Sequence, residues 1–212
     1  MQYRHAGASG LQISAVSIGG WLTFGGSIED ATTTAILKAA LDAGINFIDL
    51  ADIYAKGAAE EAAGRALAGL PRHELVISSK VFARMSPDVN DAGLSRKHIM
   101  ESCERSLKRL GTDYLDIYFC HREDPNTPLE ETAMAMDDLV RQGKILYWGS
   151  SCWTAGSLRR SHDIARPFGR HALRVEQPQY NLLTREIEAE VLPTAQELGI
   201  GLVIWSPLAG GA

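Results

Sequence analysis

The chain has 212 residues, of which 45% are hydrophobic and 22% are charged. This balance is typical of one globular domain with a large buried core, and it excludes a disordered or fibrous chain. The 21 Lys and Arg residues against 26 Asp and Glu give a net charge of -5, so a general attraction for nucleic acid or an anionic membrane is excluded.

The predicted elements alternate between short apolar runs and amphipathic segments along the whole chain. This alternation is typical of a parallel sheet with crossover helices. The predicted strands are Ala15–Ile18, Asn46–Leu50, Leu75–Lys80, Tyr114–Cys120, Ile145–Gly149, Arg174–Gln177 and Gly201–Trp205. The predicted helices are Glu29–Ala43, Ala58–Ala68, Ser95–Leu110, Leu129–Gln142, Ala155–Ala165 and Arg185–Leu198.

The same glycine-containing turn follows four of the predicted helices. The turns DAGIN, RLGTD, RQGKI and ELGIG start at Asp42, Arg109, Arg141 and Glu197. Such turns indicate a helix that ends with a left-handed glycine before the next strand, which favours one repeated unit. The GxGxxG motif of a dinucleotide-binding sheet is absent, so the sequence predicts a (β/α)8 TIM barrel in a single domain, residues 1–212.

A complete barrel of this class has eight strands and about 250 residues. The predicted elements correspond to about the first seven strands, so we expect a C-terminally incomplete barrel.

The three cysteines, Cys103, Cys120 and Cys152, form neither a CxxC pair nor a metal-ligand spacing. Their odd number argues against a disulfide framework and favours reduced thiols. The N-terminal residues lack an apolar signal-peptide region, and apolar runs of membrane-spanning length are absent from the sequence. We therefore expect a cytoplasmic protein with no membrane insertion, no metal and no nucleic-acid partner.

Four ionisable residues follow three consecutive predicted strands. Asp49 and Tyr54 come at and after the end of the second strand, Lys80 ends the third, and His121 follows the fourth. Each residue alone is better explained as a structural residue, but neighbouring strands lie only about 4.8 Å apart, so their ends converge on one pocket. The group suits carbonyl reduction: Tyr54 donates a proton, Lys80 lowers the pKa of the phenol, Asp49 keeps Lys80 charged, and His121 orients the carbonyl oxygen.

The motifs IDLADIY, VISSK and YFCHRED contain these four residues and resemble the catalytic set of the aldo-keto reductases. The further motifs GGWLTFGG, IYAKGAAEE, GLSRKHI, NTPLEE, YWGSSCW and WSPLAGG are most similar to the branch that contains the potassium-channel β subunits. This resemblance extends along essentially the whole chain. It implies an NADP-dependent oxidoreductase that converts a small aldehyde or ketone to an alcohol.

The resemblance also implies the residues that bind NADPH. Ser151 and Gln177 would hold the nicotinamide amide, Trp205 would support its ring, and the loop from Ser206 would approach the diphosphate. The full predicted cofactor set is Gly20, Trp21, Asp49, Ser151, Cys152, Gln177, Trp205, Ser206, Pro207, Leu208 and Ala209.

Two departures from the family pattern affect this interpretation. Cys152 stands where many members have Asn, which weakens one expected cofactor contact. His121 stands where animal channel subunits commonly have Asn, which favours a catalyst over a regulator. The family's later Gly-Lys-Tyr loop and its 2'-phosphate clamp have no counterpart in these 212 residues.

Two alternatives remain. The channel-type motifs are also consistent with a cofactor-binding regulatory subunit of a potassium channel that has little or no catalysis. A lysine at a barrel strand end can also form a Schiff base, so Lys80 could belong to an aldolase. The sequence names neither the substrate nor the oligomeric state, and a homo-oligomer is compatible with it.

Overall fold

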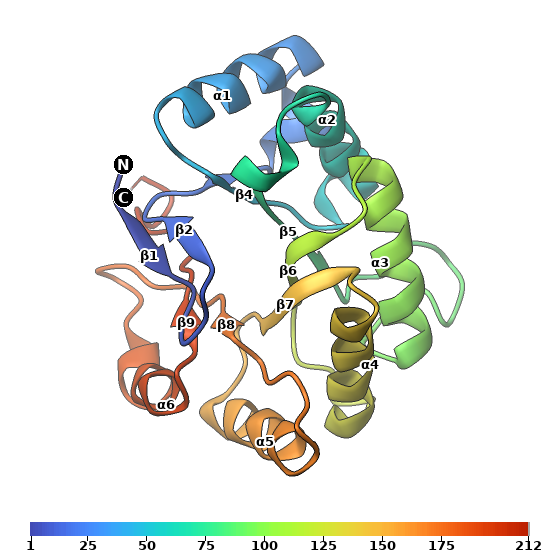
Figure 1. Cartoon of the computed structure of the whole chain (residues 1–212), viewed down its shortest axis with the longest axis vertical. Helices are drawn as coiled ribbons and strands as arrows, with labels where there is room; N and C mark the ends of the chain where they lie inside the picture. Colours follow the sequence, from blue (N-terminus) through green and yellow to red (C-terminus); the bar gives the residue numbers. More distant parts are fainter. Residues whose placement is uncertain (212) are drawn as a thin grey trace.

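The computed structural model describes residues 1–211 and contains a curled parallel sheet surrounded by helices (Figure 1). The sheet has seven strands in the order β3-β4-β5-β6-β7-β8-β9, and neighbouring strands pair in parallel. The helices follow one another around the outside of the strands in chain order, as the (β/α)8 barrel prediction requires. The described chain forms a partial barrel of this class.

The strands of the sheet are β3 (Ile18–Gly19), β4 (Phe47–Asp49), β5 (Val76–Val81), β6 (Leu115–Cys120), β7 (Ile145–Ser150), β8 (Val175–Glu176) and β9 (Gly201–Leu202). The helices are α1 (Asp30–Asp42), α2 (Ala58–Leu67), α3 (Arg96–Leu110), α4 (Leu129–Arg141), α5 (Ala155–Ala165) and α6 (Val191–Leu198). The four predicted glycine turns are confirmed, because Gly44, Gly111, Gly143 and Gly199 all have positive φ.

Alternate residues of the central strands pack into two different cores. In β6, Tyr118 and Cys120 belong to the apolar cluster that includes the helices, whereas Ile117 and Phe119 belong to a separate apolar cluster inside the curled sheet. Both faces are therefore buried, which explains why the central strands read as continuous apolar runs rather than alternating patterns.

An N-terminal hairpin that the sequence did not predict closes one end of the sheet. Its strands are β1 (Tyr3–His5) and β2 (Gln12–Ser14), which pair antiparallel. Its turn approaches the start of β9 so closely that a Cβ on Gly7 would lie 2.5 Å from the Gly201 nitrogen. The hairpin covers the N-terminal strand ends and leaves the C-terminal ends free for a site.

The predicted bounds of three elements are wrong. The first strand is the pair Ile18–Gly19 rather than Ala15–Ile18, and the last contracts to Gly201–Leu202 with one further bridge at Trp205. The predicted helix Arg185–Leu198 is divided into a 3-10 turn, Glu186–Glu188, and α6. Pro193 explains the division, since its ring excludes a continuous helix and is tolerated only in the first turn of α6.

Candidate functional site

Strand alternation directs three polar side chains into the interior at the C-terminal end of the sheet. Phe47 and Val76 lie in the inner apolar cluster, so Asp49, Ser78 and Lys80, at even spacings along the same strands, point to the same side. Asp49 pairs in register with Ser78, and the Ser78 hydroxyl donates to Asp49 Oδ1 at 2.6 Å.

The Lys80 ammonium joins the predicted residues into one cluster. Lys80 Nζ donates to Asp49 Oδ2 at 2.8 Å, to the Leu50 carbonyl at 2.6 Å and to the Tyr54 hydroxyl at 3.0 Å. These contacts use all three protons of an ammonium group. The side chain is fully buried, so Lys80 is poorly placed to form the Schiff base of an aldolase.

Burial and neighbouring charges act in opposite directions on the pKa values of Lys80 and Tyr54. Burial lowers the pKa of Lys80, but the Asp49 carboxylate and Tyr54 outweigh it, so the net pKa is raised and the ammonium stays charged. Burial raises the pKa of Tyr54 by more than the Lys80 ammonium lowers it. Lys80 thus lowers the pKa of the phenol as predicted, but burial outweighs this effect and the pKa of Tyr54 is raised overall. Tyr54 therefore keeps its proton at neutral pH and can donate it.

His121 lies beside Tyr54 and is uncharged. The two rings meet edge to face, with centroids 6.0 Å apart and an interplanar angle of 73°. Burial, followed by the positive charges of Lys80 and Arg122, lowers the pKa of His121 to about 3. A neutral imidazole carries one N–H, so His121 can donate a single hydrogen bond to an oxygen near the Tyr54 hydroxyl.

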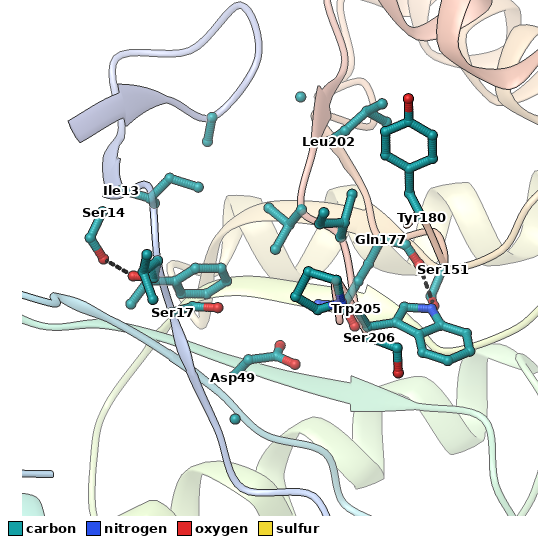
Figure 2. Close-up of a pocket in the computed structure, with 18 of the residues that line it drawn as sticks. Ile13, Ser14, Ser17, Asp49, Ser151, Gln177, Tyr180, Leu202, Trp205 and Ser206 are labelled. Carbon is teal, nitrogen blue, oxygen red and sulfur yellow. Dashed lines mark hydrogen bonds between the residues drawn. The ribbon is translucent and has the colours of Figure 1, made fainter. Parts of the chain in front are cut away.

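A cavity of about 1050 Å³ adjoins this cluster and extends along the inside of the curled sheet to the N-terminal hairpin, where Ile13 and Ser14 line it. Its lining includes Asp49, Tyr54 and His121, together with six further residues of the predicted cofactor set: Trp21, Ser151, Gln177, Trp205, Ser206 and Pro207. Figure 2 shows Ser151, Gln177, Trp205 and Ser206 close together, and the Ser151 hydroxyl donates to the Gln177 carbonyl at 2.8 Å. The structure thus brings residues from distant parts of the sequence to one cavity.

The other predicted cofactor residues lie beside the cavity rather than in its lining. Gly20 follows β3, where its nitrogen donates to the Asp49 carbonyl at 3.0 Å. Cys152 and Leu208 are exposed, and Cys152 and Ala209 have positive φ values of 57° and 50°. Positive φ in non-glycine residues is uncommon and often occurs next to ligand sites.

Sequence reasoning missed four buried polar residues that hold the loops around the cavity. Asp52 and Glu60 flank Tyr54 in the sequence, and both are fully buried. Glu176, on β8, accepts hydrogen bonds from the Ser150 hydroxyl and the Trp153 nitrogen. Asn181 donates to the Ser206 carbonyl at 3.0 Å and so ties the loop after β8 to the loop after β9.

Two further structural properties concern residues 1–211 alone. Every helix there is too short or too polar to cross a bilayer. Within the same range, no three His, Cys, Asp or Glu side chains gather closely enough to hold a metal ion.

Comparison with known protein families agrees with this arrangement. The model of the "Aldo/keto reductase family" matches residues 15–212. The chain belongs to the aldo/keto reductase family. The (β/α)8 barrel of this family therefore applies to it, and the described residues form part of such a barrel.

The similar proteins include several named after potassium channels. Proteins of Oryza sativa subsp. japonica and Arabidopsis thaliana, each named "Probable voltage-gated potassium channel subunit beta", are 45% identical over 100% of this chain. A similarly named protein of Schizosaccharomyces pombe is also 45% identical, over 99% of the chain. The chain spans 65% of the length of the two plant relatives and 62% of that of the yeast relative.

Proposed function

We propose that this aldo/keto reductase transfers hydride from NADPH to an aldehyde or ketone and yields the alcohol. The observation that supports this most directly is the Lys80 ammonium, which donates to both Asp49 and Tyr54, two residues that line the cavity. Reduction places negative charge on the carbonyl oxygen, and a protonated phenol beside a fixed ammonium is suited to neutralise it.

The lining of the cavity fits a nicotinamide cofactor. The Gln177 side chain is buried at the cavity wall, and its amide forms no hydrogen bond with another described side chain or backbone group. This amide offers both a donor and an acceptor, which a carboxamide requires. Ser151 lies against the Gln177 backbone, and Trp205 offers a flat apolar face. When bound, the cofactor would supply the hydride.

Each residue of the cluster then has a separate role. Tyr54 donates its proton to the carbonyl oxygen, and His121 donates an N–H to the same oxygen and orients it. Lys80 stabilises the phenolate that remains on Tyr54, and Asp49 keeps Lys80 charged. The preference for NADPH over NADH is drawn from the family and needs its own measurement.

A fluorescence titration with NADPH and NADH, followed by a panel of aldehydes, tests the proposal. We expect binding of NADPH and loss of the reduced nicotinamide signal on addition of an aldehyde. Tyr54→Phe should retain cofactor binding and lose turnover, since only the hydroxyl is removed. Turnover at the wild-type rate in this variant would refute the role of Tyr54.

The names of the relatives support a second candidate function, that of a cofactor-binding regulatory β subunit of a potassium channel. Tight NADPH binding without reduction of any aldehyde in the panel would favour it. The complete set of Asp49, Tyr54, Lys80 and His121 supports the catalytic alternative, because a binding subunit has no need of a proton donor.

A further inference from the structure

The segment that follows Tyr54 has an unfavourable backbone conformation. Ala55, Lys56 and Gly57 have consecutive positive φ values of 48°, 52° and 95°. Glycine adopts such values without steric cost, but alanine and lysine do not. Strain of this kind persists only where the surrounding structure holds the segment in place.

Two buried carboxylates on either side of this segment attach it to its surroundings. Before it, Asp52 Oδ2 accepts a hydrogen bond from the Ser102 hydroxyl of α3 at 2.8 Å. After it, Glu60 accepts from the Ser79 hydroxyl at 2.6 Å and from Arg109 Nε of α3 at 2.6 Å. Both carboxylate side chains are fully buried.

The donors on α3 lie along one face of the helix. Ser102, Ser106 and Arg109 are spaced at i, i+4 and i+7, and Arg109 Nη2 also donates to the Ser106 hydroxyl at 3.3 Å. Arg109 also packs against the strained turn, since a Cβ on Gly57 would lie 2.8 Å from Arg109 Cδ.

The buried side chain of Asp52 lowers the stability of the folded protein. Its Oδ1 atom is buried and has no hydrogen-bond partner among the described residues. Burial raises the pKa of this carboxyl group to about 7, while the charges of Glu60 and Arg109 act on it in opposite directions. A buried carboxyl group with one unpaired oxygen lowers stability, so packing does not explain why Asp52 is buried. Its contact with Ser102 does explain it, because this contact joins the loop that bears Tyr54 to the outer helix layer.

We propose that Asp52, held by Ser102, is a positioning residue that fixes the Tyr54 hydroxyl beside Lys80. The catalytic part of this inference rests on the proposed reductase function. Asp52 is two residues from Tyr54, and the Tyr54 nitrogen donates to the Ala51 carbonyl at 3.1 Å, so a shift of the Asp52 backbone is transmitted to the phenol. The Glu60–Arg109 ion pair holds the other end of the segment.

Ser102→Ala is the most direct test, because it removes the Asp52 contact without changing a charge. Ser161→Ala is the matched control: Ser161 is also a fully buried helical serine, and its hydroxyl donates to Leu158 of its own helix α5. Asp52→Asn, which keeps an acceptor for Ser102, is the conservative variant. Thermal unfolding first establishes that each variant is folded.

Amide hydrogen exchange measures the positioning without any need for activity. In Ser102→Ala, residues 51–57 should exchange faster than in the wild type, while residues 76–81 of β5 should be unchanged. The Ser161→Ala control and Asp52→Asn should both resemble the wild type in this segment. Unchanged exchange in residues 51–57 of the folded Ser102→Ala protein would overturn the proposal, whether or not the protein is a reductase.

Steady-state kinetics measures the consequence for catalysis. Ser102→Ala should lower kcat by about tenfold or more, since small displacements of reacting groups have effects of this order. The dissociation constant for NADPH should stay within about twofold, because all predicted cofactor residues except Asp49 lie on other loops, and Asp49 is held on β4 by Lys80 and Ser78. Faster exchange with an unchanged kcat would overturn the positioning role. Absence of turnover in the wild type would instead refute the proposed function, and the exchange result would still decide whether Asp52 holds the segment.

Discussion

The buried pair of Lys80 and Asp49 gives the sharpest prediction for the stability of the fold. Lys80→Met replaces the ammonium with an apolar group of similar size and removes three hydrogen bonds. Among residues 1–211, Asp49 then keeps only the Ser78 hydroxyl as a side-chain donor. Removal of one partner of a buried ion pair typically costs about 3–5 kcal/mol, and we expect a loss in this range.

A double-mutant cycle separates the pair from general damage to the core. Asp49→Asn alone leaves the Lys80 charge without a counter-charge and should also destabilise the protein. The double variant has neither charge, so its loss should be smaller than the sum of the single losses by about 2 kcal/mol. The free energy of unfolding is measured in urea for all four proteins, with the m-value as a check of two-state behaviour.

An exposed ion pair of the same type provides the control. Lys38 and Asp42 on α1 lie 3.2 Å apart, with 74% and 66% of their side chains exposed. Lys38→Met should cost no more than about 0.5 kcal/mol. Strict additivity in the Lys80 and Asp49 cycle would show that the two charges do not stabilise one another, and would refute the account given for the site.

The Lys80–Asp49 pair also predicts how the stability of the protein changes at alkaline pH. Because the pKa of Lys80 is raised above 10.5 in the folded protein, its stabilisation is complete below that pH and is lost as the pH rises through the higher folded value. Lys80→Met lacks this contribution, so the difference in stability between the two proteins should shrink above pH 10.5.

Three further predictions test other parts of the site. His121 has a folded pKa of about 3, below its unfolded value of 6.5, so protonation of the unfolded chain lowers the stability of the folded protein as the pH drops below 6.5. At pH 5 this loss is about 2 kcal/mol, and His121→Asn should remove it in urea unfolding; an equal loss in the variant would contradict this. Gln177→Leu should weaken NADPH binding about tenfold by fluorescence titration, and unchanged affinity would exclude the proposed amide contact. Gly57→Ala should lower the free energy of unfolding by more than about 1 kcal/mol, because φ is 95° and the added Cβ meets Arg109; an unaffected midpoint would show that the turn relaxes.

The parts of the fold that the sequence predicts well are those with strong apolar signals. The strands β5, β6 and β7 are observed within one residue of their predicted bounds, because every residue of β5 and β6 and most residues of β7 are buried. The hairpin of β1 and β2 was missed because β1 is fully exposed and neither strand has an apolar pattern. Its position depends on contacts with β9 that are distant in sequence.

The residues of the candidate site also fall into two groups, those that the sequence predicts and those that it does not. Asp49, Tyr54, Lys80 and His121 could be grouped from sequence because parallel strands end at the same edge of a sheet. Asp52, Glu60 and Glu176 could not, since a carboxylate in a loop or helix normally lies in solvent and nothing local marks it as buried. Their partners are mostly serine hydroxyls, which have no distinctive spacing. The roles assigned to the cofactor residues stay predictions until binding is measured.

The ionisable cluster and the exposed apolar residues near the cavity lie on different parts of the chain. Asp49, Lys80 and His121 belong to β4, β5 and the end of β6, whereas Trp21 and Leu208 are 58% and 76% exposed on the loops after β3 and β9. These two loops have no side-chain hydrogen bond to Lys80 or Tyr54 among the described residues. A directed-evolution library confined to them can therefore vary the shape and polarity of the cavity entrance while the ionisable network is inherited intact. For the reductase proposed above, this separation makes the chain a practical starting point for engineering altered substrate selectivity.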